Sequence, residues 1–176
     1  EPVWAMVHKL RKAMGTRDEK YTLEGMIEFD EGYFTVESSE IEQEKGVRGR
    51  GAAGKQNVVV MAESVPLENL ETGEKSKSCR YFKAKVLETH LSLEINETIK
   101  ESIDNQSIVF TDKSTSYVDI SDFVELHITE KSDKETTNET LKWVHITISN
   151  AKRNLLGNYH KIKRKYLQLY LNEFIC

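Results

Sequence analysis

The sequence predicts an α/β domain in which helices flank a central, mixed, five-stranded sheet. Apolar residues recur with the two-residue period of strands in some segments and with helical spacing in others. The chain has 176 residues, enough for one domain with a core, and 38% of them are hydrophobic and 31% charged, as in ordinary globular proteins. No apolar run approaches the roughly 20 residues that a membrane helix needs.

The first half of the chain predicts one helix followed by three strands. Five apolar residues of the segment 3–14 share one helical stripe: Val3, Met6, Val7, Leu10 and Met14. Gly15 is expected to end this helix. Alternating β-prone residues predict strands at 22–34, 57–65 and 78–88, separated by a polar, glycine-containing loop at 35–56 and a turn region at 66–76.

The second half predicts an alternation of helices and strands. Helical spacing recurs at 91–103, and the short apolar run at 107–112 is typical of a central strand. A short helix at 117–123 and a strand at 124–129 follow, then a polar loop, and an amphipathic helix is expected at 163–174.

The segment 141–157 fits two structures. Val144, Ile146 and Ile148 alternate as in a strand, but the apolar residues also fit one face of a helix. The length of the segment, its Ala-Lys-Arg-Asn-Leu-Leu tail and the stop signal Gly157 favour the helix. With a helix here, the order of elements is that of an RNase H-like α/β domain. This order is only moderately specific, because mixed sheets flanked by helices are common.

The charges are segregated along the chain. The net charge of −4 argues against a protein that binds nucleic acid over its whole surface. Every charged residue from Lys45 to Lys55 is nevertheless basic, and no acidic residue lies between Glu139 and Glu173. Such segments are either solvated faces or surfaces for a polyanion.

Two aspartates stand where apolar strands give way to polar residues. Asp30, in "IEFDEGYF", is expected at the inner end of the first strand, and Asp112, in "VFTDKSTSY", at the end of the buried strand. If these strands are neighbours, the two carboxylates meet at one edge of the sheet and need a cation between them. Such oxygen ligands suit Mg²⁺ or Mn²⁺, which activate water or a 3′ hydroxyl for attack on phosphorus. The alternative is structural, with Asp30 capping a turn and Asp112 capping a helix.

A third ligand would come from the helix predicted at 141–157. On that helix His145, Ser149 and Lys152 share one stripe at the border between the apolar face and solvent. A histidine at such a border is either a ligand or a structural residue with satisfied hydrogen bonds, and both readings stay open.

Four blocks of the sequence resemble the successive signatures of the ISXO-type insertion-sequence transposases (the IS fifteen-ninety-five group): "IEFDEGYF", "RGRGAAGKQNVVVMAE", "VFTDKSTSY" and "WVHITISNAKRNLLGNYHKIKRKYLQLYLNEF". The resemblance covers about residues 23–174. It implies an RNase H-like catalytic domain over 21–176, preceded over 1–20 by the end of a helical DNA-binding region.

The match also assigns residues to the site of a DDE-type enzyme. Asp30 and Asp112 fall on the first two catalytic acids, and His145 falls on the third position, often Glu or Asn in the family, which gives a DDH version. Two divalent ions, Mg²⁺ or Mn²⁺, are expected at these three residues, and an imidazole ligand favours Mn²⁺. Glu139 is the fallback acid, but it lies in the predicted polar loop, out of helical phase with Ser149 and Lys152.

The resemblance implies a metal-dependent reaction on DNA: strand cleavage at the ends of an insertion sequence, then transfer of the freed 3′ hydroxyl into target DNA. Contacts to DNA phosphates are expected from eight basic residues: Arg48, Arg50, Lys55, Lys152, Arg153, Lys161, Lys163 and Arg164. A homodimer on DNA is expected because two ends must be joined.

The expected location is the cytoplasm, in association with the nucleoid and not with a membrane. Cys79 and Cys176 form no CxxC pair, which excludes a disulfide scaffold and a cysteine zinc site and fits a reducing compartment. Two alternatives stay open for the function. One is a DNA-binding transposase remnant with an inactive site, and the other is a metal-dependent, structure-specific DNA nuclease without strand transfer.

Overall fold

A computed structural model describes residues 2–37, 54–89, 92–113, 117, 119–130 and 139–176. Its sheet contains β1 (Met26–Thr35), β2 (Lys55–Glu68), β3 (Lys75–Val86), β4 (Ile108–Asp112) and β5 (Leu126–Glu130), in the spatial order β3-β2-β1-β4-β5. The first three strands are antiparallel neighbours, whereas β4 runs parallel to both β1 and β5. The predicted α/β class with a mixed five-stranded sheet is confirmed, and the architecture is compatible with an RNase H-like fold.

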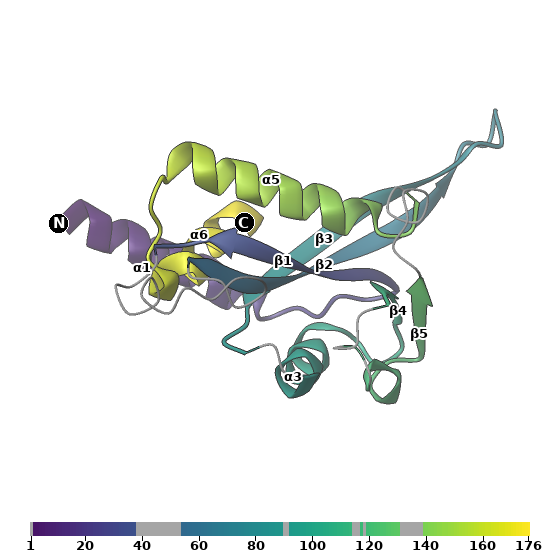
Figure 1. Cartoon of the computed structure of the whole chain (residues 1–176). Helices are drawn as coiled ribbons and strands as arrows, with labels where there is room; N and C mark the ends of the chain where they lie inside the picture. The colour runs from purple at the N-terminus through teal and green to yellow at the C-terminus, as the bar shows by residue number, and fades with distance from the viewer. Residues whose placement is uncertain (1, 38–53, 90–91, 114–116, 118, 131–138) are drawn as a thin grey trace.

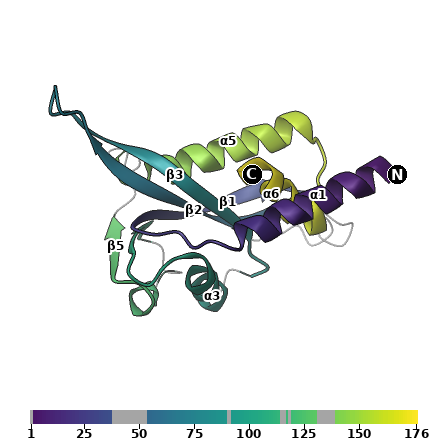
Figure 2. The same ribbon diagram turned by 180° about the vertical axis from the view of Figure 1, so that it is seen from behind.

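Helices cover both faces of the sheet (Figure 1). They are α1 (Pro2–Asp18), α3 (Ser92–Ser102), α5 (Lys142–Asn158) and α6 (Leu167–Ile175), with single 3₁₀ turns at Ile120–Asp122 and Arg164–Tyr166. Helix α5 lies along one face and α3 lies on the other, and the reverse view shows α1 beside α6 at one end of the sheet (Figure 2). No helix in these described ranges combines the length and apolar character that crossing a membrane requires.

The alternation of side chains along β1 divides the interior into two cores. Ile27 and Phe29 belong to the core that α3 covers, whereas Phe34 belongs to the core beneath α5 and α6. Glu28 and Asp30 lie on the same strand face as Phe34, by period two. Two acidic side chains of a central strand therefore point toward α5, where burial makes an unpaired charge costly.

Several predicted boundaries shift. The first strand begins at Met26 and not at residue 22. Because β1 continues past Asp30 to Thr35, Asp30 lies in the middle of the strand, and its predicted place at the strand's end is wrong. The predicted turn region 66–76 is wrong in part, because β2 extends to Glu68 and β3 already begins at Lys75. The two strands form a hairpin that projects beyond the rest of the sheet (Figure 1). The helix favoured at 141–157 is confirmed as α5.

The prediction that Gly15 ends the first helix is wrong, because α1 continues to Asp18. The glycine serves close packing instead. A Cβ atom built on Gly15 would lie 2.1 Å from Nδ2 of Asn172 in α6. That Nδ2 atom also donates a hydrogen bond of 3.2 Å to the carbonyl oxygen of Arg11. A side chain at position 15 would displace the amide group of Asn172 and break this hydrogen bond.

Helix α1 packs on α6 through a polar stripe and not through its apolar one. Arg11 is buried and pairs with Glu173 at 2.7 Å, while Val3, Met6 and Leu10 of the predicted apolar stripe stay exposed. The guanidinium group of Arg11 also stacks 4.1 Å from the ring centroid of Tyr170. The interface between α1 and α6 therefore depends on an ion pair and aromatic contacts.

His8 lies buried in the same interface, among aromatic rings. Its ring centroid is 4.0 Å from that of Trp4 and 4.9 Å from that of Tyr166. Neither ring nitrogen has a hydrogen-bond partner among the described residues. Burial, followed by the positive charge of Arg11, lowers the pKa of His8, and Glu173 opposes this only in part. The folded protein therefore favours the neutral imidazole.

We predict that His8 destabilises the protein in acid. Because its pKa is lower in the folded than in the unfolded state, the unfolded chain binds more protons, and stability falls as pH drops below about 6.5. The variant His8→Phe keeps a ring in the cluster and should lose this part of the pH dependence. Urea denaturation at pH 7.5 and pH 5.5 measures it. The variant His160→Phe, at an exposed histidine, is the control, and an equal acid sensitivity of wild type and His8→Phe contradicts the prediction.

Candidate active site

The strand register brings Asp30 and Asp112 toward each other. In the parallel pair of β1 and β4, Met26 lies opposite Ile108 and Glu28 opposite Phe110, an offset of 82 residues. Asp30 and Asp112 share this offset (112 − 30 = 82) and are the next residues on the same strand faces, two positions beyond the last paired residues. The two aspartates therefore follow the point where β1 and β4 stop pairing, Asp30 in the middle of β1 and Asp112 at the end of β4.

A buried carboxylate fixes the start of α5 above β1. The side chain of Glu28 is fully buried and accepts hydrogen bonds from the backbone N–H groups of Trp143, at 2.6 Å, and Val144, at 3.0 Å. These N–H groups belong to the first turn of α5, where a helix has no internal acceptors and a positive dipole end. A carboxylate from β1 thus caps a helix that starts more than one hundred residues later in the chain.

Lys77 completes the environment of Glu28. Its Nζ atom lies 2.5 Å from Oε1 of Glu28 and 2.8 Å from the carbonyl oxygen of Thr140. The indole Nε1 of Trp143 donates to the carbonyl oxygen of Lys77 at 3.2 Å. Strands β1 and β3 and the start of α5 are joined through one polar cluster, defined by Glu28, Lys77, Thr140 and Trp143.

The cluster places His145 over Asp30. His145 follows Val144 by one residue, and its Nε2 atom lies 3.0 Å from Oδ2 of Asp30. The hydrogen bond with Asp30 raises the pKa of His145, burial opposes it, and the negative charges of Asp30, Glu28 and Asp112 raise it further. The effect of the Asp112 charge on this imidazole is in line with the register that aligns Asp112 with Asp30.

Polar groups also support the site from the opposite face of the sheet. Glu31 points away from α5 and accepts a hydrogen bond from Nδ2 of Asn57. The buried hydroxyl of Tyr117 shares a hydrogen bond with Glu31, and burial followed by the charges of Glu31, Asp30 and Asp112 raises the pKa of Tyr117. The tyrosine therefore remains neutral beneath the aspartates.

Sequence reasoning missed Glu28, Lys77 and Glu130. Glu130 ends β5 directly opposite Asp112 and accepts a hydrogen bond of 2.7 Å from the Thr140 hydroxyl. Asp112 and Glu130 end two neighbouring parallel strands, and this alignment could have revealed Glu130. The strand predicted at 124–129 stopped one residue before it. Only the fold reveals Glu28 and Lys77. Glu139, the fallback acid, is exposed just before α5.

The side chains of Asp30, Asp112 and His145 are of the types that bind divalent cations. Carboxylate oxygens with one imidazole nitrogen match the preferences of Mn²⁺ and, less well, of Mg²⁺. Across the described portions of the chain, no three His, Cys, Asp or Glu side chains are arranged so that they could hold a metal ion as they stand. Asp30 directs one oxygen to His145, and its other oxygen accepts the N–H of Glu31 at 2.7 Å. A metal ion would compete with this ion pair for the carboxylate.

The predicted phosphate-binding residues fall into separate places. Lys152 and Arg153 lie in the later turns of α5, Lys161 follows that helix, and Lys163 is exposed just before the 3₁₀ turn. Arg164 is occupied within the protein, because it donates to the carbonyl oxygen of Lys55 at 3.2 Å and to the side chain of Gln56. Arg48 and Arg50 lie outside the described residues.

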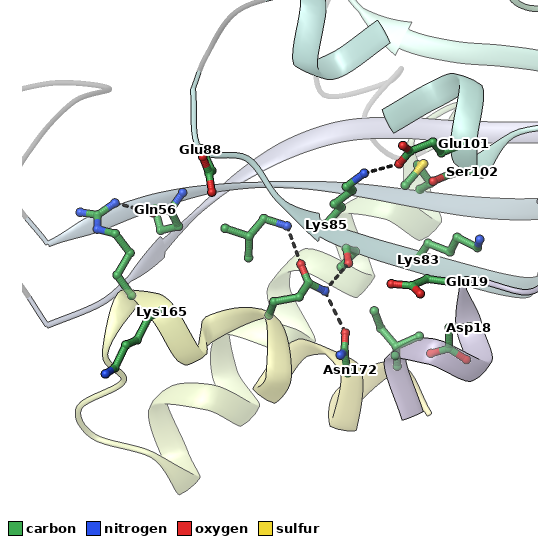
Figure 3. Close-up of a pocket in the computed structure, with 17 residues that line it drawn as sticks. Asp18, Glu19, Gln56, Lys83, Lys85, Glu88, Glu101, Ser102, Lys165 and Asn172 are labelled. Atoms are coloured by element: carbon green, nitrogen blue, oxygen red, sulfur yellow. Dashed lines mark hydrogen bonds and ion pairs between the residues drawn. The ribbon is translucent and has the colours of Figure 1, made fainter. Parts of the chain in front are cut away.

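A hollow of about 1160 Å³ lies apart from the aspartates and His145, between β3, α6, α1 and the end of α3 (Figure 3). The side chain of Gln168 spans it: its Oε1 accepts a hydrogen bond from the N–H of Val86 in β3, and its Nε2 donates one to Oδ1 of Asn172. The charged residues that line it in the described part of the chain are evenly divided: Lys83, Lys85, Arg164 and Lys165, against Asp18, Glu19, Glu88 and Glu101. The balance of charge makes this hollow a poor place for a phosphate backbone.

We predict that Glu28→Gln destabilises the protein by about 2 kcal/mol, because it removes a charge that accepts three hydrogen bonds. It should also change the environment of His145, since the first turn of α5 loses its anchor. Denaturation measures the first effect, and the NMR titration of His145 measures the second. Glu63→Gln is the matched control, another buried carboxylate of the sheet, which pairs with Arg80. If both variants leave the titration of His145 unchanged, Glu28 does not position it.

Comparison with known proteins identifies the family. A family model described as the ISXO2-like transposase domain matches residues 22–175, which spans β1 through α6 and contains Asp30, Asp112 and His145. No match was found among curated proteins. Since the family model covers nearly the whole chain, the protein belongs to the family of ISXO2-like transposase domains.

Proposed function

We propose that the chain catalyses metal-dependent cleavage of DNA strands at the ends of an insertion sequence and joins the freed 3′ ends to target DNA. What supports this proposal is the contact between His145 and Asp30, together with the register that aligns Asp112 with Asp30. The family supports a transposase acting on DNA.

Asp30 and Asp112 are the proposed metal-binding carboxylates. Divalent ions bound by such carboxylates activate a water or a 3′ hydroxyl and neutralise charge on the reacting phosphate. In cleavage, water attacks phosphorus, the bond from phosphorus to the 3′ oxygen breaks, and a 3′ hydroxyl and a 5′ phosphate result. In strand transfer, that 3′ hydroxyl attacks a target phosphate and displaces the 3′ oxygen of the target strand.

His145 has two proposed roles that its surroundings support. As a neutral imidazole it completes the ligand set, which makes the site a DDH version. As an imidazolium paired with Asp30 it hydrogen-bonds and positions the scissile phosphate. The raised pKa of His145 favours the charged form while Asp30 is its partner. Binding of a cation at Asp30 would favour the neutral form.

The DNA would run over the side of α5 that carries Lys152 and Arg153. Such phosphate contacts position the duplex and carry little sequence information. The proposed homodimer follows from the need to hold two ends of the element together. Residues 1–20 are proposed as the end of a DNA-binding region, joined to the catalytic domain through the contacts between α1 and α6.

We predict that Asp30→Asn and Asp112→Asn each lower DNA cleavage at least a hundredfold while DNA affinity changes less than about threefold, because the amide cannot replace a charged metal ligand. Gel assays of cleavage and of binding on DNA that carries the element's ends measure the two effects. Glu74→Gln, in the turn of the projecting hairpin, is the control.

The same assays separate the alternatives. A DNA-binding remnant would bind DNA without cleavage in the wild type, and its aspartate variants would behave like the parent. A structure-specific nuclease would cut DNA but never join pre-cut ends to a target. Either pattern overturns the proposed strand transfer.

Exchange of the metal tests the role of His145. If His145 is a ligand, the wild type should be more active with Mn²⁺ than with Mg²⁺, and His145→Glu should reduce that preference, because a carboxylate suits Mg²⁺ better than imidazole does. Cleavage rates of both proteins in each metal give the comparison, and removal of metal by a chelator should abolish activity. An unchanged metal preference in His145→Glu would assign the histidine to phosphate positioning.

A further inference from the structure

A second hollow lies farther along the seam between β1 and α5. It encloses about 360 Å³ between the C-terminal ends of these two elements and the segment that follows α5. Its inner wall is apolar, formed by four buried residues: Phe34, Val36, Leu155 and Ile162. An apolar interior of this size with a few polar groups at the rim is typical of sites for small ligands.

The walls of this hollow are held by backbone and side-chain contacts. The N–H of Glu37 donates to the carbonyl oxygen of Ile162 at 2.8 Å, and Glu37 forms a parallel bridge with Lys163. Tyr159, another wall residue, packs 4.5 Å from the ring of Tyr170, and its hydroxyl contacts Arg11 and Glu173. Contacts within the protein therefore hold both the wall that contains Glu37 and the wall that contains Tyr159.

The charges at its rim are mainly positive. Lys152 reaches in from α5, with its Nζ atom 5.6 Å from the ring centroid of Phe34, and Lys161 approaches from the segment after α5. Among the described residues that line this hollow, Glu37 is the one acidic residue. An anionic group at the mouth would thus meet two lysines, while an uncharged, planar group would fit the apolar interior.

The hollow lies within a few nucleotides of the proposed reaction centre. Thr35 is five residues beyond Asp30 on β1, about 17 Å along the strand. Lys152 is seven residues beyond His145 on α5, about 10 Å along the helix. A DNA strand whose scissile phosphate lay at Asp30 could pass this opening.

We propose that this hollow receives one unstacked base of the DNA strand near the scissile phosphate. This inference rests on the proposed function and adds a subsite to it. The base would bury its faces against the apolar wall and Tyr159, and Lys152 and Lys161 would neutralise the phosphates on either side. A base in a paired duplex cannot enter such a hollow, so the protein should favour DNA in which a nucleotide is already unpaired.

The test uses two duplexes that differ in one position, where a 2-aminopurine is either paired or left unpaired beside a nick. We expect the full chain to bind the unpaired duplex about tenfold more tightly, in the range that base stacking on aromatic side chains provides. Binding should also shield the unpaired base from acrylamide quenching of its fluorescence.

Two variants on the last turns of α5 locate the effect. Leu156 is exposed and lines the hollow, so Leu156→Glu places a negative charge at its mouth. Asn154→Asp adds the same charge to an exposed residue of the same helix that does not line it. We expect Leu156→Glu to abolish both the tenfold preference and the shielding, and Asn154→Asp to retain them.

The outcomes separate this inference from the proposed function. A wild type that binds and cleaves DNA but shows neither preference nor shielding overturns the base subsite alone. Equal loss in the two variants also overturns it, since the effect would then reflect general repulsion of DNA. A protein that binds neither duplex contradicts the proposed function itself.

Discussion

The burial of Glu28 is the constraint on which the arrangement of the site depends. An ionised carboxylate inside a sheet loses its hydration, at a cost of several kcal/mol, and can remain there only if charged and polar partners replace the water. Lys77 and the first turn of α5 are those partners. Because both N–H groups must point at one carboxylate, the start of α5 is fixed in position and direction over β1. His145 follows directly, and its contact with Asp30 is a consequence of this anchor.

The same part of the sheet concentrates negative charge. Glu28, Asp30, Asp112 and Glu130 lie on the adjacent strands β1, β4 and β5, and Glu28 is paired with Lys77. Asp30 relies on an imidazole that is itself titratable. A metal ion at Asp30 would compete with the protonated imidazole for the carboxylate, and the imidazole would then lose its proton to solvent.

The surroundings of the site divide into surfaces of different chemistry. The hollow between β3 and α6 is lined by residues of balanced charge, and Gln168 hydrogen-bonds across it to β3. This is in line with a structural junction between α1 and the edge of the sheet. The seam between β1 and α5 has an apolar wall with lysines at its rim. A DNA strand that approaches Asp30 would therefore meet favourable charge along α5 and not along α6.

The sequence by itself determined the class of fold, the element order and the identity of Asp30, Asp112 and His145 as candidates, because hydrophobic period, strand ends and family blocks are local properties. It also favoured the helix at 141–157 over a strand. It could not locate Glu28 and Lys77, or the packing of Gly15 against Asn172, because each of these contacts joins residues separated by tens to more than a hundred positions. The apolar stripe of α1 misled for the same reason: periodicity shows which residues share a face, but only the tertiary structure decides which face meets a partner.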